Sequence, residues 1–521
     1  MSWLTKPRRW FPIYLGLAAG LVAVYLLTSG LGGELGFPLD DAWIHQTYAR
    51  NFAESGRWEY VRGESSAGST APLWTLMIAA GYWPGLSYTW WTWGLGVLSL
   101  ALTAWAAQSL TSRLYPEPEL SWLPPAVGLL CLGEWHLVWA AASGMETTLF
   151  AALSLALMAQ AAAVFSETER MVLARWAGVG VLAGLLVLTR PEGVILIALI
   201  GLLGTGLLAG RAWPWRDFPR AMAAAGLGAG ALLLPYLLFN LNLSGRLWPN
   251  TYYAKQAEYA AELAAPWLVR LGRVSLPPLT GFQILLVPGL VLSLARLGPR
   301  AGRGDPRKLL KTLLAALPLT YGVAHLLLYA LRLPVVYQHG RYLIPAIPAI
   351  ILSGAGGTAR WFAALRPGRG RRVIGRSWTV ATLALLLAFY ALGARSFGQD
   401  VRFIQGEMVA GAHWLAENTE PDAPVAAHDI GAIGYFAGRP MLDLAGLISN
   451  EVVPLMGREV ELADYVLDSP AQYLVTAPGW PYDRLTGSKG VSLVFSTDFQ
   501  WTVEMGMNNS AIYRLPDRES R

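Results

Sequence analysis

The segment that decides the fold assignment is GFPLDDAWIH, residues 36–45, which follows an apolar run over residues 11–31. The run is long enough to cross a bilayer and has no small-residue cleavage site, so we interpret it as an uncleaved first membrane helix. Asp40 and Asp41 then form a carboxylate pair at the mouth of that helix. Charge is unfavourable near a bilayer, which makes the pair a candidate functional site. The alternative is a helix cap, with Asp41 capping a helix that starts at Ala42.

The composition predicts a polytopic membrane protein. Of the 521 residues, 54% are hydrophobic and only 14% are charged, whereas soluble domains carry about 25% charge. The single cysteine, Cys131, has no partner for a disulfide within the chain. The net charge of +6 comes from basic residues in short loops between apolar spans. This distribution is a topology signal and lacks the basic stripe that nucleic acid would require, so no nucleic-acid partner is expected.

Apolar runs predict about 11 transmembrane helices. With the N-terminus placed in the cytoplasm, the cytoplasmic loops hold about twice as many Lys and Arg as the outward connections, which supports that orientation. The expected protein is therefore mainly α and multi-pass in the plasma membrane. The spans are expected at residues 11–31, 88–111, 122–141, 146–165, 171–189, 192–209, 219–241, 279–296, 309–331, 343–359 and 374–394.

Residues 395–521 contain no spanning run and predict a small extracytoplasmic α/β domain, whereas residues 1–394 form the membrane domain. The domain has enough apolar residues for a core of its own. The first outer loop, residues 32–87, contains an apolar run that is too short to cross the membrane. The loop predicts two interfacial helices instead. The expected elements are helices at 42–55 and 71–83, a helix ending near Asn418, and strands at 425–427, 472–476 and 491–495.

With this topology, unusual polar residues collect on the outer face. Each has an ordinary structural explanation: Glu146 favours a helix start, Arg190 and Glu192 can pair locally, and Lys255 can extend to the interface. A single outward cavity lined by these side chains is the simpler hypothesis. Its candidate residues are Asp40, Asp41, His45, Glu146, Arg190, Glu192, Asn250, Tyr252, Lys255, His339, Arg341, His428 and Asp429.

Such a cavity has a chemical use. Carboxylates can act as general bases on a sugar hydroxyl, and Arg and Lys stabilise a phosphate leaving group. A membrane enzyme also gives a lipid-linked substrate lateral access. The chain shows no Gly-rich nucleotide loop and no metal-ligand cluster of diagnostic spacing. We therefore assign no metal site and no certain cofactor, and a divalent cation stays open beside Asp41 and His45.

The first-loop motif resembles that of the GT-C-fold glycosyltransferases, membrane enzymes that use polyprenyl-phosphate sugars. The likeness rests on LDDAWI at 39–44, YARN at 48–51 and GSTAPLWT at 68–75. Further motifs are similar to the mycobacterial-type terminal arabinofuranosyltransferase group, with protein O-mannosyltransferases and the lipid A aminoarabinose transferase as more distant relatives. These motifs are TRPEG at 189–193, PNTYYAK at 249–255, HGRY at 339–342 and HDIGAIGY at 428–435.

The resemblance implies a catalytic acidic residue in the first outer loop, and that role maps onto Asp40 or Asp41. We expect transfer of arabinofuranose, another pentose or mannose from a polyprenyl-monophosphate donor to a glycan, lipid or protein acceptor of the cell envelope. Our candidates for binding the donor phosphate and sugar are Arg341, His339, Lys255, Arg190, Glu146, Glu192, Tyr252, Asn250 and His45, and those for the acceptor side are His428 and Asp429.

Two other classes of protein fit the same topology. A flippase or transporter of a lipid-linked glycan usually has repeated or discontinuous helices with charges near the membrane midplane. Here the charges lie at the outer helix ends. A non-catalytic scaffold that binds glycan predicts instead that loss of both Asp40 and Asp41 leaves function intact.

Overall fold

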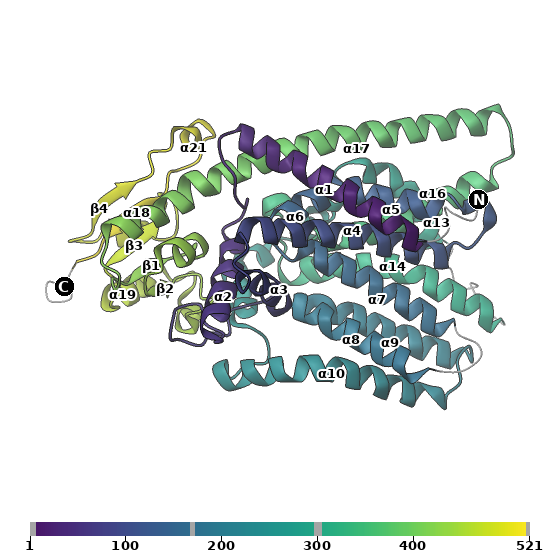
Figure 1. The fold of residues 1–521 in the computed structure, drawn as a ribbon, viewed down its shortest axis with the longest axis horizontal. Helices are drawn as coiled ribbons and strands as arrows, with labels where there is room; N and C mark the ends of the chain where they lie inside the picture. Colours follow the sequence, from purple (N-terminus) through teal and green to yellow (C-terminus); the bar gives the residue numbers. More distant parts are fainter. Residues whose placement is uncertain (1–6, 167–171, 296–304, 517–521) are drawn as a thin grey trace.

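The computed structural model describes residues 7–166, 172–295 and 305–516, and these are mostly helical. Long helices lie side by side in one bundle, and a small sheet domain sits at one end of it (Figure 1). In the described part of the chain, eight helices are long and apolar enough to cross a membrane. They contain α1 (Pro7–Leu31), α4 (Tyr88–Leu114), α7 (Thr147–Phe165), α9 (Val194–Ala209), α10 (Asp217–Ser244), α14 (Pro306–Arg332), α16 (Ile347–Ala364) and α17 (Arg369–Phe403).

Two further pairs of apolar helices are bent where they meet, which the sequence did not predict. The run predicted as one span at 122–141 is α5 (Leu123–Gly133) followed by α6 (Trp135–Ala142), with a bend of 54° between them. Glu134 lies at the bend in extended conformation, and its side chain accepts from the Leu137 N–H at 2.9 Å, so it caps α6. The second pair bends by 104° and ends in η5 (Phe282–Leu286) and α13 (Val287–Ala295).

All 11 predicted spans fall on helices over the residues that the structure describes, with residues 171 and 296 of two spans outside them, and the predicted fold class is confirmed. Eight cross by length and composition and two more are the bent pairs. The remaining one, α8 (Leu173–Thr189), is apolar but shorter. The other helices of the membrane part are α2 (Asp41–Ser55), α3 (Pro72–Tyr82), η1 (Pro118–Leu120), η2 (Pro191–Gly193), α11 (Asn250–Glu258), η3 (Ala260–Ala264), α12 (Trp267–Ser275), η4 (Pro277–Leu279), α15 (Tyr337–Gly340) and η6 (Ile344–Ala346).

The C-terminal domain contains a five-stranded sheet in the order β2-β1-β3-β5-β4. Strand β1 pairs in parallel with β2 and β3, and β5 pairs antiparallel with β3 and β4. The strands are β1 (Val425–Ala427), β2 (Met441–Asp443), β3 (Tyr473–Thr476), β4 (Ser492–Ser496) and β5 (Ala511–Arg514). The helices are η7 (Ile404–Val409), α18 (Ala410–Asn418), η8 (Ile433–Ala437), η9 (Asn450–Leu455), α19 (Glu459–Asp468), α20 (Asp483–Thr486) and α21 (Gln500–Glu504).

One apolar core cluster of the sheet domain includes Leu444, Val452, Val466 and Leu474. Three strands were predicted, and the structure adds β2 and β5. Helix α17 continues through η7 into α18, so one helical run of 50 residues, Arg369–Asn418, passes from the bundle into the sheet domain. Figure 1 shows this run (green) along the full length of the bundle.

The first outer loop packs directly against the sheet domain. The Trp43 ring contacts the rings of Tyr435 and Phe436 with centroids 5.2 and 4.7 Å away. Arg50 Nη1 donates to the Tyr435 carbonyl at 2.7 Å, and the Tyr60 hydroxyl donates to the Ile430 carbonyl at 2.6 Å. These aromatic contacts and hydrogen bonds tie the first outer loop to the sheet domain. The carboxylate pair therefore lies between the bundle and the sheet domain.

Candidate active site

A cavity of about 230 Å³ opens beside Asp41. One part of its wall is charged, and another part is apolar, with Val194 and Ile195 of α9 and Leu328 and Leu333 at the end of α14. Pockets of this kind, largely apolar with a few converging polar groups, are typical of ligand sites. The predicted site residues that line it are Asp41, Glu146, Arg190, Glu192, Tyr252, Lys255 and Arg341.

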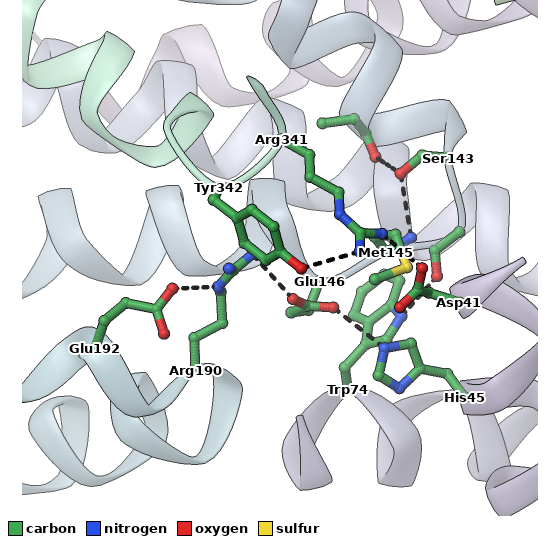
Figure 2. Close-up of polar contacts among 12 residues, drawn as sticks. Asp41, His45, Trp74, Ser143, Met145, Glu146, Arg190, Glu192, Arg341 and Tyr342 are labelled. Atoms are coloured by element: carbon green, nitrogen blue, oxygen red, sulfur yellow. Dashed lines mark hydrogen bonds and ion pairs between the residues drawn. The ribbon is translucent and has the colours of Figure 1, made fainter. Parts of the chain in front are cut away.

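Asp41 forms an ion pair with Arg341, with Oδ2 and Nη1 2.8 Å apart (Figure 2). The Arg341 Nη2 donates to the Tyr342 hydroxyl at 3.0 Å. Its Nε is buried and has no hydrogen-bond partner among the described residues. Buried donors are normally satisfied, so this nitrogen is an unmet hydrogen-bond donor next to the Asp41 ion pair.

A left-handed turn directs Arg341 toward Asp41. Gln338, His339 and Gly340 have φ values of 51°, 59° and 66° in succession. Left-handed backbone is unfavourable for residues with a Cβ and persists where the surroundings enforce it, often at functional sites. His339 is enforced by Asp400 of α17, with Nε2 and Oδ2 2.7 Å apart. The predicted donor ligand His339 therefore pairs with Asp400 and is absent from the cavity lining.

Arg190 holds two carboxylates together. Its Nε donates to Glu192 at 2.6 Å and its Nη1 donates to Glu146 at 3.2 Å (Figure 2). Its Nη2 donates to the Tyr329 hydroxyl at 3.2 Å, so each guanidinium nitrogen has a partner. His45 Nε2 lies 3.3 Å from the other oxygen of Glu146. The structure thus places His45 behind Glu146, at the edge of the site.

Lys255 connects the cavity to the sheet domain. Its Nζ lies 2.9 Å from Glu258, whose other oxygen lies 3.5 Å from His428 Nε2. His428 Nδ1 is 2.7 Å from the Tyr482 hydroxyl. Burial disfavours the Lys255 ammonium, but the neighbouring Tyr342 and Glu258 raise the pKa of Lys255 above its ordinary value. Lys255 is therefore a cation at neutral pH.

Asp40 has a different role from Asp41. Its two oxygens accept from the backbone N–H groups of Gly431 and Ala432, at 2.6 and 2.8 Å. Helix α2 begins at Asp41, and Asp40 precedes it without a side-chain capping bond. The capping alternative is therefore wrong for α2, since Asp41 pairs with Arg341 and Asp40 binds the start of another helical segment, 391 residues away in sequence.

The two carboxylates also differ in acidity. Burial and the neighbouring charge of Asp429 raise the pKa of Asp40 to about 7, against an ordinary value of 3.8. Burial acts in the same direction on Asp41, but Arg341 and Lys255 outweigh it and hold the pKa of Asp41 below its ordinary range. Adjacent groups whose environments separate their pKa values are a mark of acid–base sites.

Two other predicted residues lie beside the first cavity without lining it. Asn250 is buried at the start of α11, and its backbone N–H donates to the Ala67 carbonyl at 3.0 Å. Asp429 lines a second cavity inside the sheet domain. The described residues contain no group of three or more His, Cys, Asp or Glu that could hold a metal ion.

The cavity also contains residues that were not predicted. The Tyr342 ring lies between two guanidinium groups, 4.9 Å from Arg341 and 5.4 Å from Arg190. It belongs to the HGRY motif, so its position next to Arg341 was a usable signal. Tyr329 and Arg332 lie at the end of the apolar helix α14. They were not found because a Tyr and an Arg at a helix end are ordinary membrane-interface residues.

One family model matches the C-terminal part of the chain. Residues 398–513 match a domain of unknown function, DUF8728. No curated protein sequence matches the chain.

Solved structures are similar over most of the chain. ArnT from Cupriavidus metallidurans bound to undecaprenyl phosphate is 14% identical, with a TM-score of 0.57 over 97% of this chain and 98% of that one. The oligosaccharyltransferase of Archaeoglobus fulgidus tethered to an acceptor peptide is 11% identical, with a TM-score of 0.60 over 90% and 70%. Its complex with an inhibitory peptide and a dolichol-phosphate is 12% identical, with a TM-score of 0.57 over 89% and 69%. These neighbours have the GT-C fold, and so does this chain.

Proposed function

We propose that the chain is a membrane glycosyltransferase that transfers a sugar from a polyprenyl-monophosphate donor to an acceptor hydroxyl. The observation that carries the proposal is the Asp41–Arg341 pair, which lies in a cavity with both a cationic wall and an apolar wall. The shared fold supports it, because ArnT was solved with undecaprenyl phosphate and the archaeal enzyme with a dolichol-phosphate.

Arg341, Lys255 and Arg332 bind the donor phosphate in this proposal. All three line the cavity, and the Arg341 Nε has no partner among the described residues. Arg suits a phosphate through its planar fork and Lys through its point charge. Arg190 has a partner at each nitrogen, so we assign it to holding Glu146 and Glu192 in place. The apolar wall of the cavity receives the first part of the polyprenyl chain.

Asp41 acts as the general base. It takes the proton of the acceptor hydroxyl while the hydroxyl oxygen bonds to the anomeric carbon of the sugar. The bond between that carbon and the phosphate oxygen breaks, and polyprenyl phosphate leaves with the electron pair. Arg341 and Lys255 neutralise the charge that develops on the phosphate. When the phosphate draws Arg341 toward itself, the ion pair weakens and Asp41 becomes a stronger base.

The finer assignments follow the motifs. We propose arabinofuranose or another pentose as the donor sugar, with mannose as the alternative, and a cell-envelope glycan, lipid or protein as the acceptor. The site would face the outside of the plasma membrane. The basic connection between α16 and α17 supports this orientation, because it lies at the end of the bundle away from the sheet domain (Figure 1).

The test reconstitutes the purified chain in lipid vesicles with polyprenyl-phosphate arabinofuranose or mannose and a glycan acceptor. We expect a new glycosidic bond together with released polyprenyl phosphate. Movement of the lipid between leaflets without a new bond would show a flippase, and glycan binding without either reaction would show a scaffold. Asp41→Asn tests the assignment of the base, with Asp40→Asn as the comparison, since transfer that persists in Asp41→Asn contradicts it.

A further inference from the structure

A second cavity lies inside the sheet domain and has not been assigned a role. It measures about 360 Å³ and shares no lining residue with the first cavity. Its lining includes Asp429 after β1 and Thr476 at the end of β3, together with Phe403 of α17 and Met408 of η7. In open sheets with parallel strands, ligands bind in the crevice outside the carboxyl ends of the strands. The residues used below are Phe403, Met408, Asp429, Thr476, Trp480 and Asn508.

Asp429 provides a carboxylate without a hydrogen-bond donor. It follows β1 by two residues and lines the cavity, and none of the described residues donates a hydrogen bond to it. The other acid in the lining, Glu407, accepts from Thr497, Thr502, Asn509 and the backbone N–H of Ser510. Because Glu407 is saturated, Asp429 is the carboxylate that can accept from the hydroxyl groups of a ligand.

The rest of the lining selects the class of ligand. Trp480 offers an indole ring beside Phe403 and Met408, while Thr476 and Asn508 add polar groups. An aromatic surface with a few hydrogen-bonding groups suits the apolar face and the hydroxyls of a sugar ring. No Lys or Arg is among the residues that line this cavity. A phosphate or carboxylate would therefore meet the Asp429 carboxylate with no Lys or Arg in the lining to bind it, which disfavours anionic ligands.

The position of the cavity connects it to Asp41. The Asp40 carboxylate holds the backbone N–H groups of Gly431 and Ala432, two and three residues after Asp429. The charges of Asp41 and Lys255 both act on Asp429. Asp41 and Asp429 thus lie on opposite sides of the contact between the helical bundle and the sheet domain. Asp41 belongs to the bundle side and Asp429 to the sheet-domain side.

We propose that the cavity is an acceptor subsite for a neutral saccharide. It holds a sugar unit next to the unit whose hydroxyl receives the transferred sugar, with Asp429 accepting from hydroxyls and Trp480 stacking on the ring. The inference rests on the proposed function only in that the bound saccharide is called an acceptor of the transferred sugar. The binding of a neutral saccharide can be measured without any transfer.

The test labels the full-length chain with 5-fluorotryptophan and follows the ¹⁹F resonance of Trp480, assigned with Trp480→Phe, in the absence of donor. The probes are arabinotriose, mannotriose and, as the anionic comparison, mannose 6-phosphate. We expect the neutral trisaccharides to shift this resonance at millimolar concentration. Asp429→Asn should weaken binding about tenfold or more, since a hydrogen bond to a charged group is lost. The matched control is Asp464→Asn, an exposed acid on α19.

Every outcome of this experiment either supports or overturns the saccharide subsite. A Trp480 resonance that stays unmoved by both trisaccharides overturns the subsite, even where the protein transfers sugar. A larger response to mannose 6-phosphate, or equal weakening by Asp464→Asn, also overturns it. A shift that depends on Asp429 supports the subsite, and if transfer is then absent, the proposed function fails while the saccharide site stands.

Discussion

The adjacent carboxylates Asp40 and Asp41 have different partners in the structure. Asp41 faces Arg341 in the cavity, whereas Asp40 binds the backbone N–H groups of Gly431 and Ala432. A carboxylate that is tied to two backbone donors is a docking group, and one in an ion pair beside a cavity is free to exchange partners. We therefore assign docking to Asp40 and chemistry to Asp41.

The pH dependence of stability should report Asp40. Burial and Asp429 raise the pKa of Asp40 to about 7, so the folded state holds a proton more tightly than the unfolded state, whose Asp has a pKa of 3.8. Stability from this group should therefore be highest in acid and should fall as the pH rises from about 4 to 7. Thermal unfolding across that range should show a smaller slope in Asp40→Asn than in the wild type.

The difference between the two proteins is the informative quantity, because Asp443 has a pKa raised to about 6 by burial and adds a slope of its own. An identical slope in the wild type and in Asp40→Asn would contradict the raised pKa.

Donor binding should depend on Lys255. Replacement by Met keeps an unbranched side chain that is one atom shorter and removes the charge that faces the cavity, so the KM for the donor should rise about 10- to 100-fold. Steady-state kinetics with varied polyprenyl-phosphate sugar would measure it. Lys308→Met is the matched control, since that Lys is exposed at the start of α14. An unchanged donor KM in Lys255→Met would remove Lys255 from the phosphate site.

The sequence predicted which residue types gather around the site but not how they pair. Asp41, Glu146, Arg190, Lys255 and Arg341 were all predicted, and all line one cavity. The pairs join segments far apart in the chain, up to 300 residues for Arg341 and Asp41. Such pairing is set by the tertiary fold and leaves no spacing in the sequence.

At the scale of elements, the left-handed turn before Arg341 stands out. His339 was predicted to hold the donor phosphate, but the turn points it at Asp400. Composition does not reveal this conformation, because two of its three residues are non-Gly with positive φ. The broken helices were missed for a related reason. Glu134 sits inside an apolar run that reads as one span, and only its contact with the Leu137 N–H shows a new helix start.

Gly340→Ala should disturb the site through the backbone. The residue has φ 66°, and an added Cβ would lie 2.6 Å from the Pro277 Cβ. We expect a loss of about 1–2 kcal/mol of stability from the left-handed conformation alone, with a further drop in kcat as Arg341 moves. Gly370→Ala is the control, because a Cβ there meets nothing within 4 Å. Equal activity and unfolding temperature in both variants would argue against a constrained turn.

At the scale of the whole molecule, the bundle and the sheet domain form one working unit. A continuous helical run joins them, and the first outer loop packs on both. The sequence predicted a helical membrane part and a C-terminal part that contains both helices and strands. It did not predict that residue 394 lies within a continuous helix, because loss of the apolar pattern does not end a helix that continues into solvent.

Gly431→Ala should separate the two parts. A Cβ at this position would overlap the Asp40 carbonyl oxygen, so only glycine allows the two backbones to approach this closely. We expect faster amide hydrogen exchange in residues 430–437 and reduced transfer, with the membrane helices unaffected. Gly411→Ala on α18 should show neither change, since a Cβ there meets nothing within 4 Å. Unchanged exchange in Gly431→Ala would contradict the docking role of Asp40.

The central claim is that Asp41, and not Asp40, reacts at the junction of the two parts. The most direct measurement compares turnover and unfolding temperature in wild type, Asp41→Asn and Asp40→Asn, with a polyprenyl-phosphate sugar and a glycan acceptor. Asp41→Asn should lower kcat about 10²- to 10⁴-fold in protein that is still folded at the assay temperature. Asp40→Asn should lower the unfolding temperature and retain turnover below it. Turnover that survives in Asp41→Asn and is lost in a stably folded Asp40→Asn would contradict the account.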